Sequence, residues 1–310
     1  MRQKRGTGGI RQAGSRETAR SADGMSPPTG HAVPVRARKR LGQCFLHDRH
    51  IVEKIVALAD LGPGDAVVEI GAGAGVMTAP LAARAGSVLA VEIDPRLVQT
   101  LSTALSTLGN VTVLQGDILR FDLSRAARDL GVQRIKIVGN IPYNISSPIL
   151  FHLLTHWRAV DTAVLMMQKE VAQRLCATPG SKDYGIPTVF TAIHTCPTLA
   201  FTVAPTCFRP VPKVTSAVVR LDFRKQPLAP ITDFGLFQTL VRSAFASRRK
   251  TLVNNLRQGL PFPVSQGALR ALFETQGLES QIRGEALSPE QFIALANGLS
   301  EIEALRSPHP

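Results

Sequence analysis

Short apolar runs rich in Val, Ile and Ala alternate along the chain with longer segments whose apolar residues recur every three or four positions. The short runs are typical of buried strands, and the longer period is typical of helices packed against them. Their alternation predicts an α/β fold with a mostly parallel, doubly wound sheet, which binds ligands at the carboxyl ends of its strands. The predicted strands are residues 66–70, 88–91, 111–114, 134–138, 162–167, 199–203 and 217–223, and the predicted helices include 51–58, 76–84 and 184–194.

The two ends of the chain have a different composition. Gly, Ser, Pro and Arg dominate residues 1–35, which lack a periodic apolar pattern, and this indicates disorder. Prolines at 227 and 230 mark a linker, after which only helical periodicity remains. We therefore predict a disordered basic tail at 1–37, an α/β domain at 38–226 and a smaller, all-helical domain at 227–310.

The net charge of +13 is concentrated at the N-terminus, where residues 1–40 carry ten Lys or Arg against two acidic residues. Such a tail favours polyanions such as RNA through counterion release, although a purely solubilising tail is the alternative. No apolar run approaches the ~20 residues of a membrane span, and no apolar signal segment follows the first arginines. We expect a cytoplasmic protein that does not bind membranes; an organellar location stays open.

Neither cysteines nor histidines form a metal-binding pattern. The four cysteines include no Cys-x-x-Cys pair and are expected to be reduced. His152 and His156 share a helix face, but no glutamate lies between them, which disfavours a zinc hydrolase. We predict no metal site.

A glycine-rich turn follows the first predicted strand, at Gly71, Gly73 and Gly75. Glycines at this place let the backbone approach a nucleotide closely. A dinucleotide fingerprint would have its third glycine at position 76, where this chain has Val76. The spacing therefore disfavours NAD and favours a ligand without pyrophosphate, such as S-adenosylmethionine.

Carboxylates follow the next two predicted strands. Glu92 lies 21 residues beyond Gly71, a position at which a carboxylate can accept hydrogen bonds from both ribose hydroxyls of an adenosine ligand. Asp117 could accept a hydrogen bond from the adenine amine of the same ligand. Either acid alone is equally typical of a helix N-cap or a turn. Polar groups at three successive strand ends together favour a nucleoside site.

The fourth predicted strand delivers the turn Gly139-Asn140-Ile141-Pro142-Tyr143. Here the amide oxygen of Asn140 and the carbonyl of Ile141, which precedes Pro142, could accept hydrogen bonds from the N–H groups of a planar, amine-bearing ring. The same ring could stack on Tyr143. A nucleobase fits this description. The alternative is an ordinary exit from a strand, in which Asn and Pro are turn formers.

The loop 205–213 joins the two closing strands. It offers Phe208 as a second aromatic face, and Arg209 and Lys213 as phosphate ligands. A proline-stiffened connection is the alternative reading of the same residues.

A basic stretch occupies residues 242–257 of the predicted helical domain. A continuous helix would align Arg242, Arg249 and Arg257 on one face. A solvated face is the default interpretation of such a run, but in a basic protein with a nucleobase site we favour an RNA contact surface that includes the segment 247–250.

Together these segments resemble the ribosomal RNA adenine dimethyltransferases of the KsgA type. The resemblance covers about residues 38–300, and the segment 245–256 separates this branch from the related resistance enzymes of large-subunit RNA. The matching motifs are Leu41-Gly42-Gln43-Cys44-Phe45-Leu46, Val68-Glu69-Ile70-Gly71-Ala72-Gly73, Val91-Glu92-Ile93-Asp94, Asn140-Ile141-Pro142-Tyr143, Gln168-Lys169-Glu170-Val171-Ala172-Gln173-Arg174 and Pro212-Lys213-Val214-Thr215-Ser216-Ala217-Val218.

The resemblance implies a seven-stranded class I methyltransferase sheet, S-adenosylmethionine as cofactor, and a role in small-subunit biogenesis. The implied substrate is a pair of adjacent adenosines in the 3′-terminal hairpin loop of small-subunit RNA, each methylated twice on its exocyclic amine. We expect a monomer. The implied catalytic residues are Asn140, Ile141, Pro142, Tyr143 and Phe208; the cofactor residues are Gln43, Cys44, Leu46, Gly71, Gly73, Glu92, Ile93, Asp117, Ile118 and Asn140; the RNA-binding residues are Arg209, Lys213, Arg242, Arg248, Arg249 and Lys250.

One departure from the family pattern bears on the cofactor site, where Cys44 replaces the usual asparagine. Binding survives if the contact uses backbone atoms and weakens if it uses the amide. Ile141 replaces a commoner leucine, which is harmless because its carbonyl is the working group. A non-catalytic, RNA-binding assembly factor is the competing hypothesis; the basic tail and helical domain disfavour a small-molecule methyltransferase.

Overall fold

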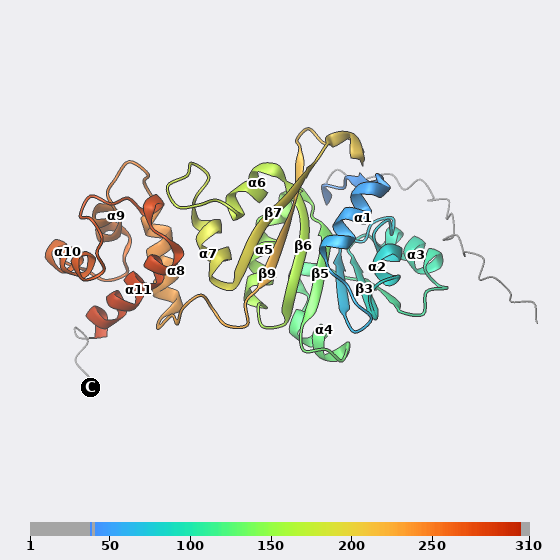
Figure 1. Cartoon of the computed structure of the whole chain (residues 1–310), viewed down its shortest axis with the longest axis horizontal. Helices are drawn as coiled ribbons and strands as arrows, with labels where there is room; N and C mark the ends of the chain where they lie inside the picture. The colour runs from blue at the N-terminus through green and yellow to red at the C-terminus, as the bar shows by residue number, and fades with distance from the viewer. Residues whose placement is uncertain (1–37, 39–40, 305–310) are drawn as a thin grey trace, which may run out of the picture. The chain divides into compact units, whose positions relative to one another are not determined.

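A seven-stranded sheet dominates the computed structural model, which describes Arg38 and residues 41–304 (Figure 1). The strands are β2 (Ala66–Ile70), β3 (Ser87–Glu92), β4 (Val111–Gln115), β5 (Ile135–Asn140), β6 (Val160–Gln168), β7 (Thr195–Val203) and β9 (Ser216–Phe223). Their order in the sheet is β4-β3-β2-β5-β6-β9-β7, and β9 alone runs opposite to the other six. This confirms the predicted class I methyltransferase sheet.

Helices cover both faces of the sheet, which explains why its central strands are apolar throughout. The helices are α1 (Arg49–Leu58), α2 (Thr78–Ala82), α3 (Pro95–Ala104), α4 (Leu123–Asp129), α5 (Ser146–Thr155), α6 (Lys169–Leu175), α7 (Ile186–His194), α8 (Phe234–Ala244), α9 (Leu252–Gly259), α10 (Gln266–Thr275) and α11 (Pro289–Ala304). Successive residues of β2 point to opposite faces: Val67 packs in the cluster with α1 and α2, and Val68 in the cluster with α4 and α5.

Aspartate side chains begin four of these helices. Each accepts a hydrogen bond from a backbone N–H of the first turn, a group that has no partner within the helix. The N-cap residues are Asp48 of α1, Asp94 of α3, Asp122 of α4 and Asp233 of α8.

Several boundaries differ from the sequence prediction. Strand β5 continues through Gly139 and Asn140, because Asn140 still pairs with Met166 of β6. The helix predicted at 76–84 is shorter, and β7 begins four residues earlier than predicted. A two-residue pair, β1 (Phe45–Leu46) with β8 (Phe208–Arg209), was not predicted, because so short a segment has no periodicity.

The C-terminal helices share the hydrophobic core that includes α5 and α7. Tyr184, which has no exposed surface, donates from its hydroxyl to the Leu287 carbonyl at 2.7 Å across this region. The division into domains at residue 226 stays a prediction. The prediction of one continuous helix through Arg242 and Arg257 is wrong, because α8 ends at Ala244 and α9 begins at Leu252.

Among the described residues, no helix combines the length and apolar character required to cross a bilayer. The basic tail predicted for residues 1–37 lies outside the described part of the chain.

Candidate active site

A pocket of about 740 Å³, partly open to solvent, lies at the carboxyl ends of β2, β3, β4 and β5. Parallel strands end at one edge of the sheet, so residues distant in sequence meet there. Residues 41–45, the last of which begins β1, form a further wall. Of the predicted residues, the pocket is lined by Gln43, Cys44, Gly71, Gly73, Glu92, Ile93, Asp117, Ile118, Asn140, Ile141, Pro142 and Tyr143; Leu41, Gly42, Phe45, Ile70, Val91, Gly116 and Ile145 line it as well and were not predicted.

Glu92 is held rigidly at the floor of the pocket. Glu92 is only 4% exposed to solvent. Its Oε2 accepts a hydrogen bond from the Gly73 backbone N–H, and its Oε1 accepts one from the Asp94 N–H, both at 2.9 Å. A carboxylate has about four acceptor positions, so two remain for the hydroxyls of a ligand.

Gly73 makes this contact possible. Its φ of +58° lies in the left-handed region, which disfavours side chains, and a Cβ here would come within 3.3 Å of the Phe45 ring. The glycine turn therefore lets the backbone approach Glu92, while the wall of residues 41–45 packs directly against Gly73.

Asn140 projects from the end of β5 and is fixed by the opposite wall. Its Nδ2 donates to the Cys44 carbonyl at 2.9 Å. No described residue donates to its Oδ1, so the amide oxygen is left as an acceptor beside the pocket. The orientation of this amide follows from a backbone carbonyl and does not depend on the Cys44 side chain.

Tyr143, which follows β5, is anchored by a residue of β9, two strands away in the sheet. Its hydroxyl lies 2.7 Å from Oγ of Ser216, a fully buried residue at the start of β9. Burial raises the pKa of the Tyr143 hydroxyl, so the ring stays neutral in the physiological range. The pocket thus has an aromatic wall held in place beside Asn140.

A model of the ribosomal RNA adenine dimethylase family matches residues 35–301. The chain belongs to the ribosomal RNA adenine dimethylase family.

Relatives and solved structures agree with this membership. Ribosomal RNA small subunit methyltransferase A of Syntrophus aciditrophicus is 50% identical over 266 residues, covering 86% of this chain and 95% of that protein. The enzyme of the same name from Magnetococcus marinus is 44% identical, covering 84% of this chain and 90% of that protein.

Two solved structures extend the comparison to three dimensions. A dimethyladenosine transferase from Plasmodium falciparum superposes with a TM-score of 0.72 at 26% identity, covering 83% of this chain and 98% of that one. The 23S rRNA methyltransferase ErmE gives 0.65 at 28% identity, covering 83% and 99%. The predicted family, fold and class of enzyme are confirmed.

Two residues predicted for the site of this dimethylase lie elsewhere. Phe208 and Leu46 pair across β1 and β8 and pack in the core, with exposures of 0% and 5%. Phe208 therefore offers no free ring face in this structure, in contrast to the expectation of a second aromatic wall. A residue's burial depends on the tertiary fold, and the β1–β8 pair carried no sequence signal.

The predicted RNA-binding residues also lie outside the pocket lining. Arg209 is exposed on β8 and Lys213 in the loop between β8 and β9, while Arg242 and Arg249 are exposed near the end of α8 and beyond it. Arg248 already uses part of its guanidinium within the protein, because its Nη2 donates a hydrogen bond to the Lys182 carbonyl at 3.0 Å. Their contact with RNA stays a prediction.

Sequence reasoning missed the unusual state of Glu69 on β2. The residue is fully buried, and neither carboxyl oxygen makes a hydrogen bond of good geometry. Burial raises its pKa to about 8; the nearby Thr78 hydroxyl opposes this change and the charge of Glu92 adds to it. A carboxylate within an apolar strand was the available sequence signal.

No group of three or more His, Cys, Asp or Glu within the described ranges is arranged to hold a metal ion.

Proposed function

We propose that this dimethylase uses S-adenosylmethionine to methylate two adjacent adenosines, twice each, in the 3′-terminal hairpin loop of small-subunit ribosomal RNA. The observation that carries the proposal is the Asn140 amide, which is fixed by the Cys44 carbonyl and lines the same pocket as Glu92 and Tyr143. The names of the curated relatives supply the choice of small-subunit RNA.

The residues of the pocket fit the proposed cofactor. Glu92 keeps two acceptor positions for ribose hydroxyls, since its other two are used by backbone N–H groups. Ile93 and Ile118 give apolar surfaces suited to a flat ring, and the carboxylate of Asp117 lies beside them as an acceptor. Asp117 also accepts the Leu119 N–H at 3.0 Å, so its local turn role and the proposed role are compatible.

The chain's own contribution to the reaction is positioning. S-adenosylmethionine, when bound, supplies a methyl group on a positively charged sulfur. In the first transfer, Asn140 Oδ1 and the Ile141 carbonyl accept hydrogen bonds from the two N–H groups of the adenine amine, which favours a pyramidal nitrogen with its lone pair available. In the second transfer, one of these acceptors binds the single N–H that remains. Tyr143 replaces the stacking that the base loses when it leaves the RNA. The excess proton passes to water.

The exposed cations would then bind the RNA backbone. Arg209 lies on β8 opposite Phe45 of the pocket wall, and Lys213 follows four residues later, so phosphates bound there would lie close to the target base. We further propose that the protein acts as a monomer on immature small subunits in the cytoplasm.

The test uses small subunits that lack the modification. The protein and S-adenosylmethionine are incubated with them, and the RNA is analysed by mass spectrometry, with Asn140→Ala as the control variant. Two dimethyladenosines in the 3′-terminal hairpin, absent with the variant, are expected. Tight subunit binding without methylation would overturn the proposal and favour the non-catalytic assembly factor.

A further inference from the structure

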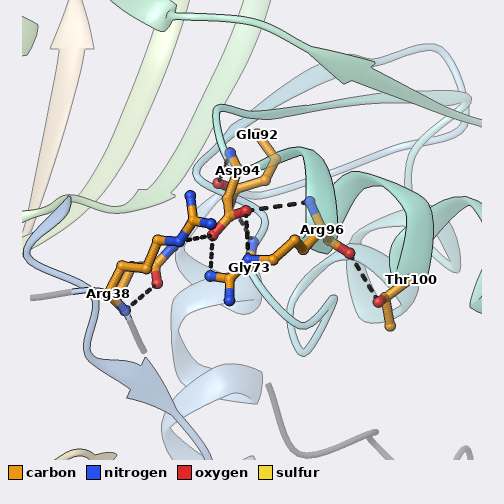
Figure 2. A network of polar contacts seen from close by, with 7 residues as sticks. Arg38, Gly73, Glu92, Asp94, Arg96 and Thr100 are labelled. Carbon is orange, nitrogen blue, oxygen red and sulfur yellow. Dashed lines mark hydrogen bonds and ion pairs between the residues drawn. The ribbon is translucent and has the colours of Figure 1, made fainter. Parts of the chain in front are cut away.

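A buried carboxylate next to the proposed cofactor acid is held by two arginines. The Asp94 side chain has 0% exposure, and Arg96 donates to it from Nε and Nη2 at 3.0 and 2.6 Å. Arg38 approaches from the other side, with its Nε 3.7 Å from Oδ2 of the same carboxylate (Figure 2). These contacts, that of Arg96 foremost, lower the pKa of Asp94 to about 2, so the group is ionised throughout the working range.

The helix does not require the second arginine. Arg96 lies two residues from Asp94 and gives it a bidentate partner, and the same carboxylate already caps α3 by accepting the Arg96 N–H at 3.2 Å. Arg38 comes from 56 residues earlier in the chain. Its ion pair therefore constrains the segment that carries it more than the helix.

Two hydrogen bonds connect Arg38 to the pocket wall. The Arg38 N–H donates to Gln43 Oε1 at 2.8 Å, and the Arg38 carbonyl accepts the Leu41 N–H at 3.1 Å. Fixing Arg38 thus fixes residues 41–45. The carbonyl that orients Asn140 belongs to Cys44 of this same segment.

Asp94 also touches the floor of the site. Its backbone N–H donates to Glu92 Oε1 at 2.9 Å, so one residue connects the proposed ribose acid, the start of α3 and the wall of residues 41–45. A shift of the wall away from Asp94 would open the pocket and release the Asn140 amide together. Positioning errors of this kind affect rate strongly even when no reacting group is removed.

We propose that Arg38 and Asp94 are a positioning pair for methyl transfer: their ion pair holds residues 41–45 as the pocket wall, and through the Cys44 carbonyl it sets the orientation of Asn140. This inference rests on the proposed function. It concerns two residues that are not among those lining the pocket.

The experiment compares two arginines that share one carboxylate. Arg38→Ala removes the partner on the wall, and Arg96→Ala removes the partner on the helix. S-adenosylmethionine affinity is measured by titration calorimetry without RNA, and kcat and KM are measured on small subunits lacking the modification. Thermal melting reports whether each variant folds.

We expect Arg38→Ala to weaken cofactor binding about fivefold and to lower kcat about fivefold, the range for a partly exposed ion pair. Arg96→Ala should change both by less than about twofold. Arg38→Lys should recover most of the loss, because a single charge contact suffices. Asp94→Asn, which can still cap α3, should match Arg38→Ala, and the double variant should lose no more than either single variant.

Three outcomes would overturn the inference: parental affinity and kcat in a folded Arg38→Ala variant, equal damage from Arg96→Ala, or additive losses in the double variant. An inactive parent protein would refute the proposed function instead. In that case a fivefold loss of cofactor affinity confined to Arg38→Ala and Asp94→Asn would still support the pair as the anchor of the pocket wall.

Discussion

Replacing Glu69 with glutamine should make the stability of the protein less sensitive to pH. The parent carboxyl is fully buried on β2 without a hydrogen bond of good geometry, and burial raises its pKa from 4.5 to about 8. An amide has nearly the same shape as a protonated carboxyl and carries no charge. The variant therefore retains the neutral form that the fold prefers.

The sign follows from where the proton binds more tightly. The raised pKa means that the folded state retains its proton up to about pH 8, while the unfolded state loses it near 4.5. Below 4.5 both states are protonated, so the group adds no pH dependence. As pH rises from 4.5 to 8 the parent loses free energy of unfolding, on the order of 5 kcal/mol at about 1.36 kcal/mol per pKa unit, and above 8 the loss is complete.

The assay is urea unfolding of parent and variant from pH 5 to pH 9, followed by circular dichroism. The difference in free energy of unfolding, variant minus parent, should increase with pH up to about 8 and then level off. Glu53→Gln, on an exposed position of α1, controls for the loss of one carboxylate. A difference that stays constant from pH 5 to pH 9 would refute the raised pKa.

Four further predictions concern the pocket and its rim. Asn140→Ala should lower methyl transfer at least about 100-fold while RNA affinity in a filter-binding assay stays within about threefold; unchanged transfer would remove the mechanism. Tyr143→Phe and Ser216→Ala should each lower kcat about two- to fivefold, as expected for one hydrogen bond, and the double variant should lose no more; additive losses would show that the hydroxyls act separately. Cys44→Asn should leave S-adenosylmethionine affinity within about twofold by calorimetry, because the contact to Asn140 is a backbone carbonyl; tenfold tighter binding would show that the side chain matters. Lys213→Ala should reduce the slope of log RNA affinity against log salt by about 1, and an unchanged slope would exclude a phosphate contact.

The parts of the site predicted from sequence share one physical cause. Glu92, Asp117 and Asn140 each end or follow a strand of a parallel sheet, and topology alone brings such positions to one edge. The apolar runs identified the strands, so the polar residue at the end of each run could be assigned to the pocket. In the structure all three residues line one pocket.

Contacts made by short or irregular segments were not predictable in this way. The pairing of β1 with β8 involves two residues on each side, which is too little for a periodic pattern, yet it buries Phe208 and places Phe45 against Gly73. The broken helix at Ala244 likewise depends on packing, because the residues that follow carry no proline or glycine to mark the end.

Asp94 shows why a motif is less informative than its geometry. In the sequence it is the last residue of Val91-Glu92-Ile93-Asp94 and has the position of an ordinary N-cap before Pro95, and the structure confirms that cap. The same carboxylate also faces Arg38, and its backbone contacts Glu92. Because burying a charge is costly unless it is well paired, a fully buried carboxylate with one local and one distant arginine constrains both partners. A local pattern can predict the first of these partners, while only the folded chain identifies the second.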